Sequence, residues 1–188
     1  SLQDDRTPEQ LTAEAVEAAK KADYVIFVGG MNKAHNQDCE DGDRLHYELP
    51  YGQDQLISAL AAVNDKVVFV SISGNAHGMP WSNDVEAILQ AWYSGSETGH
   101  AVADVIFGDV NPSGKLPYTI QPTLADYPAH QYGEIAYPGV DKQVHYMEDI
   151  FVGYRYADLY GTRRPIKYAS QGVQYTINPP KRQPIFPF

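Results

Sequence analysis

The chain has 188 residues, about the length of one domain, and 43% of them are hydrophobic and 20% charged, which excludes extensive disorder. Acidic residues outnumber basic residues 24 to 14, giving a net charge of −10. This balance argues against nucleic acid as a partner, because nucleic-acid binding needs clustered lysine and arginine. There is no run of about 18 apolar residues, so we expect no membrane span.

Helix and strand patterns alternate from the start of the chain. Thr7 precedes a proline and stands three residues before Gln10, a spacing that predicts a helix beginning with a capping box. The apolar run 24–28 that follows ends at a Gly-Gly pair. Because this run is apolar on both faces, it predicts a central parallel strand covered by helices.

The same alternation continues further along the chain. Apolar spacing predicts a helix over 53–63 and a strand over 66–72. Residues 85–93 fit either a short helix or a strand, and periodicity does not decide between them. Ser94 and Glu97 have capping-box spacing and predict a further helix that ends near residue 108.

Beyond residue 108 the chain is rich in proline and turn residues, which predicts an extended, irregular stretch. The first half therefore predicts an α/β domain with a mostly parallel sheet and helices on both faces. Ligands of such sheets bind beyond the carboxyl ends of the strands, where we place the loops 29–50 and 73–84.

The loop 29–50 is the most informative segment, because loops of this length in compact domains are usually functional or disordered. It carries several carboxylates around a single arginine, namely Asp38, Glu40, Asp41, Asp43 and Glu48 around Arg44. Crowded carboxylates can keep one carboxylic acid protonated for donation near neutral pH. The alternative is an acidic loop that is simply solvated.

At these residues the chain resembles glycoside hydrolase family 3, in its bacterial β-glucosidase branch. The resemblance covers roughly residues 22–156 and the last few residues. The motifs that carry it occur in order, at Cys39–Arg44, Glu48–Pro50, Gln53–Ile57, Ser73–Asn75, Met79–Trp81, Ala87–Tyr93, Gly95–Gly99, Ala103–Pro117, Tyr146–Tyr156 and Phe186–Phe188.

The resemblance implies the C-terminal α/β domain of that family, a three-layer sandwich with a mostly parallel six-stranded sheet between helices. We expect residues 1–156 to form this domain, incomplete at its N-terminal end. Residues 157–188 would form a surface excursion and the start of the domain's C-terminal segment. The family's other core domain is an N-terminal barrel that carries the nucleophilic aspartate, and no barrel pattern occurs in this sequence.

By the resemblance, Glu40 is the general acid/base of a retaining hydrolase, in which two carboxyl groups act in turn. Asp38 and Asp41 are close enough in sequence to be rivals for this role. Glu148 is the second choice, and the alternative for it is a structural bond, for example to Arg155.

Three further residues are candidates for binding the substrate or bracing the loop. Asp43 and Arg44 would hold the loop of Glu40 through charged hydrogen bonds. Trp81 could stack on a sugar or belong to the core. We expect no metal or other cofactor, because the six histidines lack ligand spacing and the Gly-Gly pair after the first strand lacks a phosphate-binding pattern.

The expected function is thus the acid/base domain of an exo-acting, β-glucosidase-like hydrolase of β-linked glucosides or oligosaccharides, periplasmic or secreted as is common in the family. The N-terminal barrel of the longer protein would be its partner, and this chain alone would be inactive. One alternative is a non-catalytic carbohydrate-binding or structural module. A nucleotide-binding flavodoxin-like domain is a weaker alternative, because the sequence has no glycine-rich phosphate loop.

Overall fold

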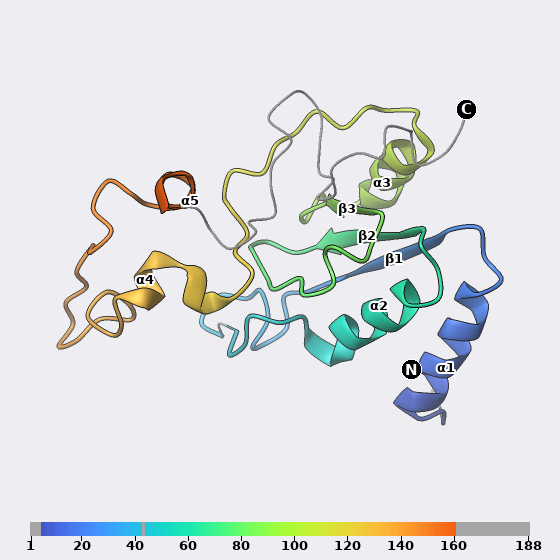
Figure 1. Cartoon of the computed structure of the whole chain (residues 1–188), viewed down its shortest axis with the longest axis horizontal. Coiled ribbons are helices and arrows are strands. Elements are labelled where there is room, and N and C mark those ends of the chain that lie inside the picture. Colours follow the sequence, from blue (N-terminus) through green and yellow to red (C-terminus); the bar gives the residue numbers. More distant parts are fainter. Residues whose placement is uncertain (1–4, 43, 161–188) are drawn as a thin grey trace.

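A computed structural model describes residues 5–42 and 44–160 of the chain (Figure 1). Its elements in chain order are α1 (Pro8–Ala19), β1 (Val25–Gly30), the 3₁₀ turn η1 (Pro50–Gly52), α2 (Gln53–Ala61), β2 (Val67–Ile72), β3 (Ala87–Gln90), α3 (Thr98–Phe107), the 3₁₀ turn η2 (Leu124–Asp126), α4 (Pro128–Gln131) and α5 (Tyr154–Tyr160).

The strands form one parallel sheet in the order β1-β2-β3, so β1 lies at an edge of the described sheet. The prediction that this strand is central and covered on both faces is wrong for the described residues, because Ile26 and Val28 on one face are 40% and 61% exposed. Figure 1 shows α1 and α2 together on one side of this sheet and α3 on the other. The α/β class with a parallel sheet and helices on both sides is confirmed. The described residues contribute three strands, so a six-stranded sandwich remains an expectation.

The core lies between the sheet and the helices α1 and α2. Phe27 of β1 packs against Phe69 of β2, with 5.8 Å between ring centroids, and Phe69 meets Trp81 edge to face at 4.7 Å. Ile57 and Leu60 of α2 belong to the same buried cluster. Burying each of these large side chains contributes about 1.5–3 kcal/mol, which fixes the strands on which the loops of interest stand.

The start of α1 is as predicted, with Thr7 as N-cap and Gln10 completing a capping box. The second predicted capping box is wrong: α3 begins at Thr98 with Glu97 as its N-cap residue. The hydroxyl of Ser94 donates instead to the carbonyl of Ala91, back toward the strand.

The undecided segment 85–93 contains a strand, β3, which pairs with β2 from Val68↔Ala87 to Ser71↔Gln90. Pairing with a neighbour resolves an ambiguity that periodicity left open.

After α3 the described chain is irregular, as expected, with two short helical turns and one isolated bridge before α5. The expected boundary after Tyr156 falls inside α5, and residues 161–188 lie outside the described part. No helix among the described residues combines the length and apolarity needed to cross a bilayer.

Candidate active site at the carboxyl edge of the sheet

Three loops leave the carboxyl ends of β1, β2 and β3 and meet at one edge of the sheet. Figure 1 shows this edge at the left, where the loop after β1 lies and where the long segment around α4 extends beyond it. Because the strands are parallel, residues far apart in sequence meet here. Both loops that the sequence placed at this edge, 29–50 and 73–84, are found there.

Arg44 ties the loop after β1 to the loop after β2. Its Nη2 donates to Asn75 Oδ1 and to the carbonyl of Ala76, both at 2.7 Å, and its Nη1 contacts Met31 Sδ at 3.4 Å. None of these three partners is a carboxylate, and Asp43, which we expected to brace the loop together with Arg44, lies outside the described residues. The guanidinium braces the loop all the same, because its planar fork reaches two acceptors at once.

Asp38 makes a second tie across the same edge. Its Oδ2 accepts hydrogen bonds from the backbone N–H of Gly74 at 2.7 Å and from the hydroxyl of Tyr93 at 2.9 Å. Tyr93 was not among the predicted site residues. The signal that could have found it is the strand alternative for 87–93, which places Tyr93 at the carboxyl end of a parallel strand, the edge that also holds Asp38.

Glu40 lies between the two ties and is exposed, as is its neighbour Asp41. The backbone N–H of Asn36 donates to the carbonyl of Gly42 at 2.8 Å, and the Cys39 thiol donates to the same oxygen at 3.4 Å. These bonds close the turn that carries Glu40. The carboxylate is therefore presented to the outside of the domain on a turn that is fixed on both flanks.

A buried polar network supports the loop after β2. Nδ1 of His77 donates to the carbonyl of Gly78 at 2.9 Å, and Nε2 accepts from the Ser71 hydroxyl at 3.0 Å. Burial lowers the pKa of His77 below its usual 6.5, so the ring is neutral. Gln90 of β3 donates to the Ser73 hydroxyl in the same network.

Trp81 lies in the core and is 1% exposed, so its ring offers no face to a sugar in this structure. Its indole N–H donates to Asp54 Oδ1 at 2.7 Å, and the other oxygen of Asp54 accepts from the backbone N–H of Leu49. Trp81 thus holds the end of the acidic loop through Asp54. Of its two expected roles, this arrangement agrees with bracing.

The remaining candidates lie elsewhere. Asp43 falls outside the described residues. Glu148 is half-buried on the segment before α5. Arg155 donates to the carbonyl of Ile150 at 3.4 Å rather than to Glu148. Among the residues that the structure describes, no group of three or more His, Cys, Asp or Glu side chains could hold a metal ion.

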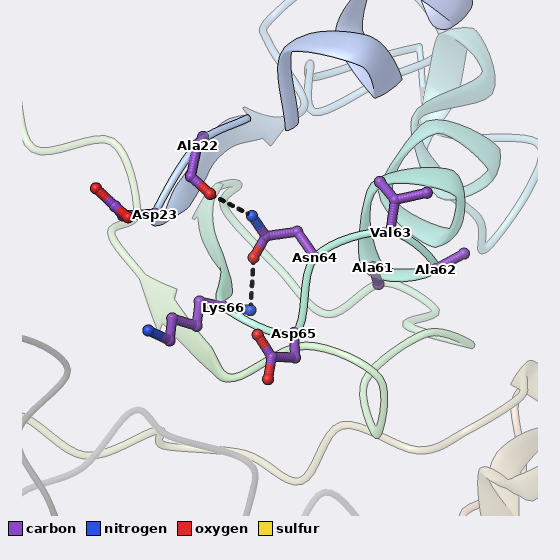
Figure 2. Close-up of a pocket in the computed structure, with 8 residues that line it drawn as sticks. All are labelled: Ala22, Asp23, Ala61, Ala62, Val63, Asn64, Asp65 and Lys66. Carbon is purple, nitrogen blue, oxygen red and sulfur yellow. Dashed lines mark hydrogen bonds between the residues drawn. The ribbon is translucent and has the colours of Figure 1, made fainter. Parts of the chain in front are cut away.

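An open pocket lies at the opposite, amino edge of the sheet (Figure 2). The Asn64 side chain donates to the carbonyls of Ala19 and Ala22 and accepts from the Lys66 backbone N–H. These bonds join the C-terminal ends of α1 and α2 to the strands. The bonds of Asn64 give this pocket a structural role. The candidate site residues, including Glu40, Asp38 and Arg44, lie at the opposite edge of the sheet.

The family model for the glycosyl hydrolase family 3 C-terminal domain matches residues 3–154. The chain belongs to this family. It is 51% identical over 170 residues to "Beta-glucosidase BoGH3A" of Bacteroides ovatus, a match that covers 90% of this chain and 23% of the relative.

Solved structures of the family share the fold. A β-glucosidase from Kluyveromyces marxianus aligns with a TM-score of 0.75 at 36% identity, covering 83% of this chain and 18% of that one. DesR, a β-glucosidase from Streptomyces venezuelae solved with D-glucose, also aligns with a TM-score of 0.75 at 36% identity, covering 84% and 20%. The chain spans less than a quarter of the length of these relatives.

Proposed function

We propose that this domain supplies the general acid/base carboxylate, Glu40, to a retaining, exo-acting β-glucosidase whose aspartate nucleophile lies on an N-terminal barrel of a longer protein. The substrate is a β-linked glucoside or oligosaccharide. Periplasmic or secreted placement belongs to the same proposal and rests on the family alone.

The observation that carries the proposal is the position of Glu40. It is an exposed carboxylate at the carboxyl edge of a parallel sheet, on a turn flanked by the ties of Asp38 and Arg44. A residue that transfers a proton to a substrate held by another domain must point outward and must be held in place. Glu40 has both properties, whereas Asp38 is occupied by two donors.

In the proposed reaction, the barrel aspartate attacks the anomeric carbon while the protonated Glu40 donates its proton to the departing glycosidic oxygen. The aglycone then leaves as an alcohol. Glu40, now ionised, removes a proton from a water molecule, which attacks the glycosyl-enzyme and releases glucose. The two carboxyl groups would lie about 5–5.5 Å apart, which requires the turn of Glu40 to reach across the domain interface.

The test is Glu40→Gln in the longer protein, assayed on two classes of glucoside. Methyl β-glucoside has a poor leaving group that needs protonation, so its hydrolysis should fall by about 10²–10⁴-fold. Glucosides of acidic nitrophenols leave without protonation, so their glycosylation step should be nearly unchanged. An equal loss on both classes, or no loss, would remove Glu40 from this role.

The alternative is a non-catalytic module that binds carbohydrate or packs against another chain. It predicts that Glu40→Gln leaves both substrate classes hydrolysed at the parent rates. Glu148→Gln, assayed in the same way, tests the second-choice carboxylate with the same change of charge.

A further inference from the structure

A single oxygen of Asp38 joins the loops that follow all three strands. Asp38 stands after β1, and its Oδ2 accepts from Gly74 after β2 at 2.7 Å and from Tyr93 after β3 at 2.9 Å. Burial and the hydrogen bond to Asp38 raise the pKa of Tyr93 above its usual 10, so its hydroxyl is protonated and donates.

The packing around this oxygen is close. A Cβ at Gly74 would lie 3.2 Å from Tyr93 Cε2, a tight contact, and 3.4 Å from Asp38 Oδ2. Glycine at this position therefore allows its own N–H, the tyrosine ring and the carboxylate to meet. The three groups form a close-packed junction, which we name the Asp38 junction and define as Asp38, Gly74 and Tyr93.

The two oxygens of Asp38 are used unequally. Oδ2 accepts both hydrogen bonds, whereas Oδ1 is buried and has no hydrogen-bond partner among the described residues. An asparagine whose amide oxygen occupies the Oδ2 position could accept the same two bonds. The junction therefore depends on a hydrogen-bond acceptor at the position of Oδ2.

Asp38 is two residues from Glu40. On its N-terminal side, Gln37 donates to the Tyr51 hydroxyl at 2.7 Å, and on the C-terminal side Arg44 holds the loop to Asn75 and Ala76. Of these ties, the Asp38 junction is the nearest to Glu40 in sequence. Loss of this tie would free the turn of Glu40 from the end of β3 and leave Arg44 as its remaining tie to the loop after β2.

We propose that Asp38 is a positioning residue that sets the place of Glu40 by accepting two hydrogen bonds, and that it exchanges no proton with the substrate. The inference rests on the proposed function. It also separates Asp38 from Glu40 in kind: a carboxylate that works by proton transfer cannot be replaced by an amide, whereas one that works as an acceptor can.

The experiment compares Asp38→Asn, Asp38→Ala and Tyr93→Phe with Tyr132→Phe as a matched control on an exposed ring. In the longer protein, Asp38→Asn should hydrolyse methyl β-glucoside at close to the parent rate. Asp38→Ala should lose up to about 10²-fold in kcat/KM on this substrate, with a much smaller loss in kcat/KM on nitrophenyl glucosides, because kcat/KM reports the glycosylation step and misplacement of Glu40 removes the benefit of protonation there. Tyr93→Phe should show the same pattern more weakly, and Tyr132→Phe should match the parent.

A second readout follows the turn itself. The 188-residue chain has one cysteine, Cys39, which is half-buried beside Glu40. Its reaction with an aromatic disulfide should be several-fold faster in Asp38→Ala and Tyr93→Phe than in the parent, and unchanged in Asp38→Asn. This measurement needs no catalysis, and Tyr93→Phe keeps it informative if circular dichroism shows that Asp38→Ala does not fold.

The proposal would be overturned if Asp38→Asn lowered the rate on methyl β-glucoside as much as Asp38→Ala does, because the negative charge of Asp38 would then be required. Parent rates and parent thiol reactivity in both Asp38→Ala and Tyr93→Phe would overturn it as well. If Glu40→Gln lacks the split between substrate classes while Asp38→Ala still exposes Cys39, the proposed function fails and the junction as a loop tie stands.

Discussion

His77 is a titratable side chain enclosed by the core, and its neighbours set its protonation state. Its ring is fully buried, its Nδ1 donates to Gly78, and its Nε2 accepts from Ser71. A proton on Nε2 would create a buried cation with no carboxylate among its hydrogen-bond partners, which desolvation disfavours. The neutral ring thereby anchors the loop whose preceding residues, 74–76, bind Arg44 and Asp38.

The lowered pKa of His77 predicts a pH-dependent stability. Below pH 6.5, the usual pKa of histidine, His77 binds a proton in the unfolded chain but not in the folded chain. The contribution of the neutral ring to the free energy of unfolding is therefore fully present above about pH 6.5. It falls as the pH drops below that value, by up to about 1.4 kcal/mol per pH unit, until the lowered pKa is reached.

Urea denaturation between pH 7.5 and 5 checks this slope. In His77→Gln the slope should be smaller by about the contribution of one proton, whereas His145→Gln, at an exposed histidine, should keep the parent slope. Equal slopes in the parent and in His77→Gln would contradict a neutral buried ring.

At the scale of elements, the junction of β1 with α2 shows how tightly the strand ends are built. Gly30 has a φ of +128°, and its N–H and C=O both bond to the side chain of Gln53 at the start of α2. A Cβ at Gly30 would lie 2.1 Å from the backbone oxygen of Ile72. No side chain fits without moving β1 away from β2.

Gly30→Ala is therefore expected to lower the free energy of unfolding by about 3 kcal/mol or more, since both the backbone strain and the clash with a neighbouring strand oppose it. Gly99→Ala is the matched control. Gly99 lies in α3 with open space around its Cα, so alanine should leave stability unchanged or raise it by about 0.5–1 kcal/mol. Urea denaturation compares the two, and equal midpoints would refute the strained position of Gly30.

The sequence predicted those elements whose signal is local. The capping box at Thr7 and the apolar runs of β1 and β2 are local patterns, and all three are found. The strand β3 was undecided because its pairing with β2 is a long-range contact. The prediction that Ser94 caps α3 was wrong, because the Ser94 hydroxyl donates to the carbonyl of Ala91.

The candidate site divides in the same way. The acidic loop at the carboxyl edge could be expected from residue types and from the parallel sheet, whereas the choice of Glu40 within it rests on the family resemblance and stays a prediction. The partners of Arg44, and the meeting of Asp38 with Tyr93, depend on strand register and on loop paths that no local pattern encodes.

For the molecule as a whole, the proposed reaction requires a second domain that carries the nucleophile. Glu40 faces outward from a chain that covers less than a quarter of its relatives, and the nucleophile is proposed to lie on the missing partner. Large apolar side chains are often exposed on the irregular segment beyond the carboxyl edge of the sheet, for example Tyr146 and Ile150.

The 188-residue chain alone should therefore show no turnover of a nitrophenyl β-glucoside, because a general acid without a nucleophile and a sugar-binding subsite lowers no barrier appreciably. The longer protein, assayed beside it at equal concentration, is the positive control. Turnover by the short chain that survives purification and is lost in Glu40→Gln would contradict the two-domain account.

The role of Glu40 is tested most directly by adding azide to Glu40→Gln in the longer protein, with a nitrophenyl β-glucoside as substrate. Glycosylation still proceeds, but the water that should release the sugar has lost its general base, whereas azide needs no deprotonation and meets no repelling carboxylate. The account predicts that azide accelerates turnover of the variant, but not of the parent, and that the product is β-glucosyl azide. Parent-like indifference to azide, with glucose as the sole product of Glu40→Gln, would contradict it.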